Sequence, residues 1–180
     1  QAGLMDRMLA RGRITPALID KLAAVIAGFH AALPHAHTDS THCALPAIQE
    51  AALHNFEAIP QLLSAPDDLA LLEAVHNAGA IEFTASLPLF RLRAAAGFVR
   101  ECHGDLHLGN IVVLDDVPTP FDCIEFSAAL RWIDVISEIS FTVMDLLQRD
   151  RPQLAWRLLN AYLAITGDYQ GCGVLRFYLA

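Results

Sequence analysis

The densest group of reactive side chains in the sequence lies in residues 103–110, which read HGDLHLGN. Two imidazoles, a carboxylate and a carboxamide stand there beside two glycines, which permit tight backbone turns. A second acid, Asp122, follows an apolar run and a turn, so the chain can return it towards the first group. Phosphoryl transfer needs groups of this kind, because a carboxylate orients the acceptor and hard oxygen ligands hold Mg²⁺.

The spacing of these residues suggests a role for each in that chemistry. Asp105 can orient and deprotonate an acceptor, and Asn110, five residues later, can offer its carboxamide oxygen to a metal ion. Asp122 can add a carboxylate ligand from the segment that follows. An acid and an Asn separated by four residues, with an Asp on the next hairpin, match the protein-kinase pattern HRDxxxxN…DFG.

The stretch HGDLHLGN resembles the HGDxHxxN catalytic motif of aminoglycoside phosphotransferases and related small-molecule kinases, which have a protein-kinase-like fold. Residues 121–126 (FDCIEF) resemble the metal-binding segment of that family, and residues 130–135 (LRWIDV) resemble the start of its next helix. Residues 11–16, which lead to Phe29-His30, resemble helices of a bacterial branch that is often fused to a P-loop ATPase-like domain. The resemblance covers most of the chain, but only the C-terminal lobe of the family fold.

This resemblance implies ATP and Mg²⁺ as cofactors and assigns the motif residues to them. Asp105 would be the catalytic base, and Asn110 and Asp122 would bind the metal and, through it, the nucleotide. The supporting residues would be His103, Glu125 and Asp134.

Each supporting residue carries its own expectation. His103 would shape the loop, and Asp134 would hydrogen-bond to the loop backbone from the following helix. Glu125 matches an acid of the same branch, and we expect it either behind the metal ligands or against the substrate.

The family's phosphate-binding elements are missing from the sequence. Neither GxGxxG nor GxxxxGK[ST] occurs, and the single lysine, Lys21, stands in a helical pattern and not on a strand. We therefore expect a fragment without the N-terminal nucleotide lobe, with weak activity or none alone. Its partners would be that lobe, in the fused branch a P-loop ATPase-like domain, and a small-molecule acceptor with a hydroxyl or amine.

Hydrophobic periodicity predicts one mainly helical α+β lobe over residues 1–180. It divides into a helical part over residues 1–97, a catalytic loop and a single hairpin over residues 98–126, and further helices over residues 127–180. A lone hairpin inside a helical body is best explained as a rigid support for catalytic groups.

Several element boundaries follow from turn and helix signals. The pair Thr15-Pro16 predicts a helix start, and a further helix is expected from Pro46. Gly79 is expected to interrupt the helix that begins near Asp67. The hairpin strands are predicted at 111–114 and 120–126, around a loop of about five residues, and buried helices at 132–147 and beyond.

Composition limits the possible partners. A net charge of −8 argues against nucleic acid and against an anionic membrane surface, and no apolar run approaches the roughly 20 residues of a membrane span. The four cysteines form no CxxC pair, which argues against structural zinc and suits a reducing cytoplasm. A secreted protein with two disulfides is the alternative.

Two other functions compete for the same residues. Residues 104–109 overlap the GDxHxG pattern of metallophosphoesterases, and His103, Asp105 and His107 could form a metal cluster, but the GDxxD and GNH[DE] segments of that class are absent. A kinase-like scaffold without activity is the other alternative, kept open by the missing lobe. Elsewhere, His30 is expected to be a core histidine and Cys102 a buried structural thiol.

Overall fold

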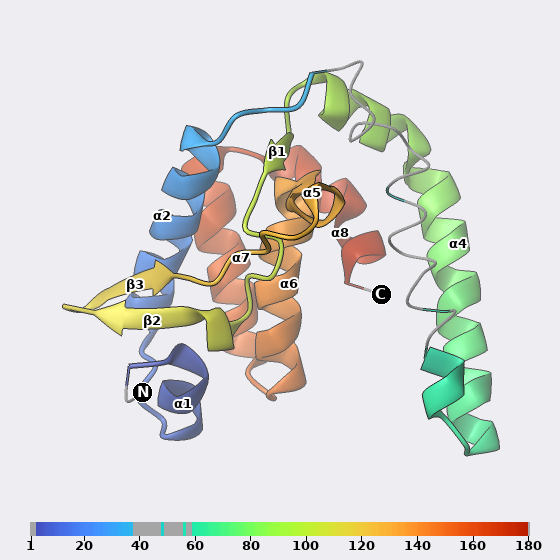
Figure 1. Ribbon diagram of the computed structural model, residues 1–180, viewed down its shortest axis with the longest axis horizontal. Helices are drawn as coiled ribbons and strands as arrows, with labels where there is room; N and C mark the ends of the chain where they lie inside the picture. The colour runs from blue at the N-terminus through green and yellow to red at the C-terminus, as the bar shows by residue number, and fades with distance from the viewer. Residues whose placement is uncertain (1–2, 38–47, 49–55, 57–58, 180) are drawn as a thin grey trace.

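The computed structural model describes residues 3–37, 48, 56 and 59–179 (Figure 1). The helix predicted from Pro46 falls mostly outside these residues. In chain order the elements are α1 (Met5–Ala10), α2 (Pro16–Ala32), η2 (Ile59–Leu62), α4 (Pro66–Ala95), β1 (Val99–Glu101), η3 (Leu108–Asn110), β2 (Ile111–Leu114), β3 (Val117–Pro120), α5 (Ala128–Arg131), β4 (Trp132–Asp134), α6 (Val135–Gln148), α7 (Pro152–Thr166), η4 (Tyr169–Gly171) and α8 (Cys172–Tyr178).

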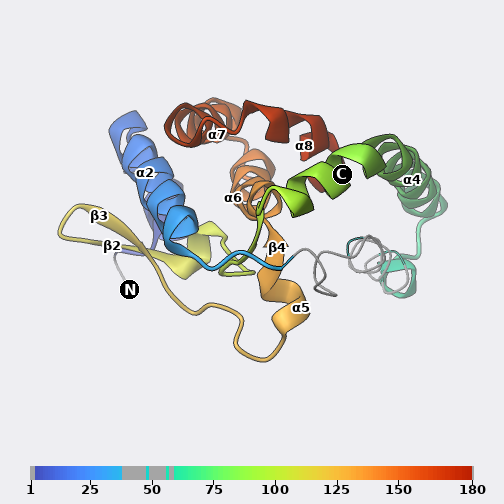
Figure 2. The same ribbon diagram turned by 90° about the horizontal axis from the view of Figure 1, so that it is seen from above.

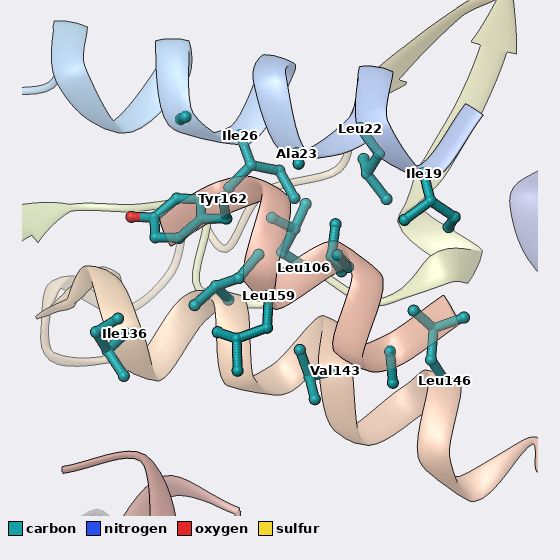
Figure 3. Close-up of a cluster of buried hydrophobic side chains, with 14 of the residues drawn as sticks. Ile19, Leu22, Ala23, Ile26, Leu106, Ile136, Val143, Leu146, Leu159 and Tyr162 are labelled. Atoms are coloured by element: carbon teal, nitrogen blue, oxygen red, sulfur yellow. The ribbon is translucent and has the colours of Figure 1, made fainter. Parts of the chain in front are cut away.

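Helix α6 lies between the α7–α8 layer and the side that carries β4 and α5 (Figure 2). Its buried side chains Ile136, Ile139, Val143 and Leu146 recur every three or four residues, which places them on one face. Helices α2 and α7 complete this core, shown in Figure 3. Leu106 also enters it with 1% of its surface exposed, so the loop over residues 103–110 is anchored in the core by its own side chain.

Helix α2 begins where the sequence predicts. The Thr15 side chain accepts a hydrogen bond from Leu18 N–H at 3.2 Å, and Pro16 takes the first helical position. Lys21 lies within this helix, as expected, and forms an ion pair with Asp116 in the hairpin turn. The hairpin is therefore attached to the helical body.

The hairpin differs from its prediction. Strands β2 and β3 are antiparallel and pair Leu114 with Val117, so Asp115 and Asp116 alone form the turn. Their φ angles of 48° and 65° are those of the two-residue turn that matches strand twist. The predicted five-residue loop and the strand over 120–126 are wrong, because these two aspartates adopt the left-handed conformation and the second strand starts three residues earlier than expected.

The prediction of a single strand pair is also wrong. Strands β1 and β4 form a second antiparallel pair, with Val99 opposite Asp134. Residues 132–134, predicted to be helical, form strand β4 instead. The helix itself, α6, starts at Val135. Only long-range pairing distinguishes these three residues from a helix start, so local sequence signals miss it.

Helix α4 is continuous over 30 residues and passes through both Gly79 and Pro88, so the predicted interruption is wrong. A glycine costs a helix only about 1 kcal/mol, which neighbouring turns can offset. The C-terminal part of α4 buries Phe83 and Phe90 against the body. No helix in the described part of the chain is both long enough and apolar enough to cross a membrane.

Candidate active site

Residues 103–110 connect β1 to β2 and lie along one face of α6. Three side chains of that helix bind the loop backbone: Glu138 accepts from Gly104 N–H at 2.7 Å, Thr142 donates to Leu106 O at 2.6 Å, and Asp145 accepts from Leu108 N–H at 2.8 Å. These side chains are four and three residues apart, so they share one helix face. They bind every second residue of the loop, because side chains and backbone groups of an extended segment alternate in direction.

The intervening residues of the loop, Asp105 and His107, are turned outwards. The Asp105 carboxylate is 40% exposed. Asn110 fixes it, because the Asn110 Nδ2 group donates both to Asp105 Oδ2 and to Asp105 O at 3.0 Å. The two residues assigned from the sequence to the base and to a metal ligand are thus in direct contact.

The segment that carries Asp122 is bonded to the same loop. Phe121 N–H donates to Asn110 O at 3.0 Å, and Ile124 N–H donates to His103 O at 3.0 Å. Asp122 lies between these two bonds with an exposed side chain and a φ of 62°. A non-glycine residue in this left-handed region stores about 1–2 kcal/mol of strain. The surrounding hydrogen bonds hold that conformation in place.

His103 joins the loop to this segment from inside the protein. It is 3% exposed, its Nε2–H donates to Phe121 O at 2.9 Å, and its Nδ1 accepts from Asp105 N–H at 3.3 Å. Both ring nitrogens are therefore occupied by backbone groups. This arrangement argues against a metal cluster of His103, Asp105 and His107, and with it against the metallophosphoesterase alternative.

His107, to which the sequence assigns no role, lies beside Asp105. Its Nδ1 accepts from Gly109 N–H at 3.0 Å, which leaves the proton of the neutral ring on Nε2. That nitrogen is 3.6 Å from Asp105 Oδ2. The ring also stands at an edge-on angle to Phe141, with centroids 6.3 Å apart.

Asp134 does not have the contact expected of it. Its carboxylate accepts from Ile136 N–H at 2.8 Å and so caps α6, and the other contact of the carboxylate is with Arg93. Glu138, one turn later on the same helix, makes the contact with the loop backbone instead. The sequence shows both acids on one helix face, but only the start of the helix decides which of them reaches the loop.

Glu125 is exposed, and its backbone carbonyl accepts from Arg131 at 3.1 Å. The same guanidinium bonds to Ile124 O at 2.9 Å and pairs with Glu101 at 3.0 Å. Arg131 therefore holds the chain just after Asp122. No motif in the sequence identifies this contact.

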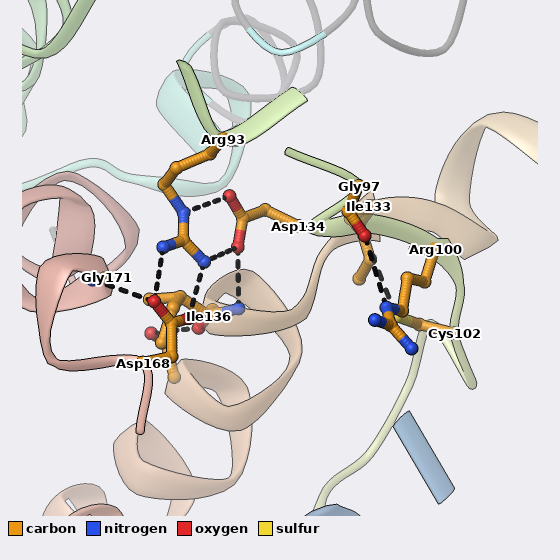
Figure 4. Close-up of polar contacts among 10 residues, drawn as sticks. Arg93, Gly97, Arg100, Cys102, Ile133, Asp134, Ile136, Asp168 and Gly171 are labelled. Carbon is orange, nitrogen blue, oxygen red and sulfur yellow. Dashed lines mark hydrogen bonds and ion pairs between the residues drawn. The ribbon is translucent and has the colours of Figure 1, made fainter. Parts of the chain in front are cut away.

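Arg93 forms a buried network that no sequence signal indicates (Figure 4). Its guanidinium, 1% exposed, bonds to both oxygens of Asp134 and both oxygens of Asp168 at 2.6–2.8 Å. Burial alone would lower the pKa of Arg93, but the bonds to the two carboxylates outweigh it and hold that pKa above its usual range. Burial raises the pKa of Asp134, against the opposing effect of Arg93.

His30 is a satisfied core histidine, as expected, with Tyr162 Oη and Glu138 Oε2 each at 2.8 Å from its ring nitrogens. Cys102 lies close by, buried, with its thiol 3.7 Å from Ile133 O. Burial raises the pKa of Cys102, so its thiol stays protonated and is a poor nucleophile, as predicted. Cys102, Cys123 and Cys172 are free thiols, which excludes the two-disulfide arrangement.

The model of the phosphotransferase enzyme family matches residues 4–175 of the chain. The chain belongs to this family. Three uncharacterized proteins, one from Mycobacterium bovis and two from strains of Mycobacterium tuberculosis, are each 34% identical to it over 92 residues. Those residues are 51% of this chain but 18% of each relative, so the chain matches a small part of much longer proteins. No solved structure matches it.

Membership of the phosphotransferase family agrees with the geometry of residues 103–124. The family match includes the loop, the segment of Asp122 and helix α6. The motif resemblance and the family match therefore point to the same class of enzyme.

Proposed function

We propose that the chain is the C-terminal lobe of an ATP-dependent kinase that phosphorylates a hydroxyl or amine of a small molecule. The observation that carries this proposal is the contact between Asp105 and Asn110, at 3.0 Å, beside a backbone-bonded segment that presents Asp122. An oriented carboxylate next to hard oxygen donors is what phosphoryl transfer requires.

The residues present fit a magnesium ion. Asp122 offers an exposed carboxylate, and Asn110 bonds to Asp105 through its amide nitrogen, which leaves its carbonyl oxygen as a ligand. In this proposal these two residues hold Mg²⁺ together with the ATP phosphates. The bound ion would neutralise charge on the transferred phosphoryl group.

Asp105 orients the acceptor in this proposal. One of its oxygens, Oδ2, is held by Asn110, and the other remains to accept the hydrogen of the acceptor's hydroxyl or amine. Because the side chain is 40% exposed, the proton it receives can pass on to solvent. His107 Nε2, at 3.6 Å from the same carboxylate, adds an N–H donor on the outward side of the loop.

The lobe that binds the rest of the nucleotide would come from another part of the protein. The described residues supply the acceptor side of the reaction, and the sequence carries no glycine-rich phosphate loop. We propose that an N-terminal nucleotide lobe completes the site. The relatives, which extend far beyond the matched region, have room for such a lobe.

The test is Asp105→Asn in a longer protein that includes the nucleotide lobe. Loss of the carboxylate should lower kcat by about 10²–10⁴-fold while the affinity for Mg²⁺ and ATP is retained, because the general base acts on the acceptor. Asp150→Asn is the matched control, since Asp150 is also an exposed aspartate but follows α6 and lies outside residues 103–124. Turnover would be followed by ADP release and nucleotide binding by calorimetry.

Near-normal turnover in Asp105→Asn would refute the assignment of the base. If the unaltered protein neither binds Mg²⁺ with ATP nor turns over in the presence of the nucleotide lobe, the scaffold alternative is correct instead.

A further inference from the structure

The contact of Glu138 with the catalytic loop continues into the protein interior. Glu138 uses both carboxylate oxygens: Oε1 accepts from Gly104 N–H at 2.7 Å, and Oε2 lies 2.8 Å from His30 Nε2. The other ring nitrogen of His30 lies 2.8 Å from Tyr162 Oη. His30, Glu138 and Tyr162 are 3%, 2% and 1% exposed, so water does not compete for these bonds.

The direction of each bond follows from the chemistry of the groups. A carboxylate only accepts, so the proton between His30 and Glu138 belongs to His30 Nε2. In the neutral ring Nδ1 then accepts from the Tyr162 hydroxyl. Burial raises the pKa of Tyr162, which keeps that hydroxyl protonated. A continuous series of hydrogen bonds therefore runs from α7 through α2 and α6 to the loop.

A metal ion is the other occupant to consider, because ligand atoms of His30, Cys102 and Glu138 lie within 4.8 Å of one another. Both ring nitrogens of His30 are already hydrogen-bonded, and the Cys102 thiol is directed to Ile133 O. In the part of the chain that the structure describes, this group has three members and each is satisfied without a metal. The arrangement is that of a hydrogen-bond network.

The loop conformation depends on the end of this network. Gly104 has a φ of +85°, and a Cβ atom there would lie 2.7 Å from Leu130 O. The backbone at this tight turn is fixed by its N–H bond to Glu138, and the next residue is Asp105. Without His30, Glu138 Oε2 would be buried and unpaired. The flexible Glu138 side chain would then turn towards another donor and break its bond to Gly104 N–H.

We propose that His30, supported by Tyr162, is a positioning residue for phosphoryl transfer. It orients Glu138, which fixes Gly104 and thereby the direction of the Asp105 carboxylate. The kinetic part of this inference rests on the proposed function, whereas the effect on the loop backbone does not.

The experiment compares His30→Leu, His30→Gln and Tyr162→Phe in the longer protein with its nucleotide lobe. Hydrogen exchange of the peptide that contains Gly104 measures the loop bond, and steady-state kinetics measure kcat and KM. We expect faster exchange at Gly104 in His30→Leu and a fall in kcat of about tenfold to hundredfold, with little change in KM, because a misplaced catalytic group mainly slows the chemical step. His30→Gln, whose amide can still donate to Glu138, should restore most of both.

Asp168→Asn is the control for a merely structural effect. Asp168 belongs to the buried network of Arg93, and its side chain bonds to Arg93 and to Gly171 N–H. It should lower the melting temperature without faster exchange at Gly104 and without a loss of kcat. If His30→Leu does not fold, Tyr162→Phe tests the network from its far end, because it removes the support of His30 Nδ1 and keeps the imidazole. A smaller rise in exchange at Gly104 is expected there.

Unchanged exchange at Gly104 in a folded His30→Leu variant would overturn the proposal. So would an equal loss of kcat in Asp168→Asn, or one equivalent of zinc in the purified protein. Unchanged exchange in Tyr162→Phe would remove Tyr162 from the proposal. If the unaltered protein shows no turnover, the proposed function fails, and the exchange result still decides whether His30 holds the loop.

Discussion

At the scale of single residues, the site combines fixed groups with one strained residue. Asn110 and backbone bonds fix Asp105, while Asp122 keeps a φ of 62° in the open. Aspartate tolerates this region better than most residues, but glycine adopts it freely. The structure thus retains a carboxylate where the backbone conformation alone would favour glycine, as expected if the carboxylate has a function.

The change Asp122→Gly tests this trade between stability and function. Relief of the left-handed strain, less the entropy that glycine loses on folding, should stabilise the fold by about 0.5–1 kcal/mol. In the longer protein it should also weaken Mg²⁺-dependent nucleotide binding, measured by calorimetry. Asp150→Gly is the matched control, because Asp150 has a φ of 58° and lies outside the site. It should stabilise the fold similarly without changing nucleotide binding, and a loss of binding there would contradict the interpretation.

The residues that are close in sequence were predictable, and those that support them from a distance were not. The motif over residues 103–110 and the return of Asp122 are local patterns of chemistry and turns. Glu138, Thr142 and Asp145 bind loop residues that precede them by 34–37 positions, and nothing in their own spacing identifies what they contact. The role given to Asp134 shows the consequence, since the helix register selects Glu138.

At the scale of elements, α6 has two faces with different tasks. One face carries Ile136, Ile139 and Val143 into the core, and the other binds the loop backbone through Glu138 and Thr142. The helix is therefore both the centre of the hydrophobic core and the support of the loop over residues 103–110. A change in core packing that shifts α6 would therefore also shift the loop backbone that its side chains bind.

Thr142→Val isolates one of these supporting bonds. Valine keeps the shape but removes the hydroxyl, so the buried Leu106 carbonyl loses its donor, which should destabilise the fold by about 1–3 kcal/mol. Ser140→Ala is a close control, because Ser140 is equally buried on α6 but bonds to Ile136 O within its own helix. Urea unfolding of both variants measures the difference. Equal destabilisation of the two variants would show that the bond to Leu106 O stabilises the fold no more than a bond within the helix does.

Element prediction succeeded where the signal was local. Thr15 and Pro16 mark the start of α2 by capping chemistry, and the helix begins there. The apolar pattern predicts a helix over residues 132–134, because no local signal reveals their pairing with β1, which lies some 30 residues earlier. The hairpin turn was placed wrongly because Asp115 and Asp116 do not carry the glycine that usually marks such a turn.

At the scale of the whole molecule, segments distant in sequence are joined by Arg93. It brings the end of α4 against Asp134 at the start of α6 and Asp168 before η4. Arg157 makes a chemically similar pair with Asp20 between α7 and α2, at 2.8 and 2.7 Å, but in solvent. The two arginines therefore allow the same kind of ion pair to be compared in a buried and in an exposed position.

Replacement of each arginine by methionine should change the stability of the fold by very different amounts. Arg93→Met leaves two buried carboxylates without their cation and should destabilise the fold by about 3–5 kcal/mol at pH 7. Arg157→Met removes an exposed pair that solvent screens, and it should change stability little. Urea unfolding followed by circular dichroism measures both variants.

The pH dependence of Arg93→Met identifies the cause. Burial already raises the pKa of Asp134, and loss of Arg93 removes the main opposing effect, so the folded-state pKa rises further above that of the unfolded chain. The folded variant then binds a proton more readily than the unfolded chain does, and its stability should recover as the pH falls from 7 towards 5. The destabilisation relative to the unaltered protein should therefore shrink on acidification. A difference in the free energy of unfolding that stays constant over this range would assign the loss to packing instead of to the unpaired carboxylates.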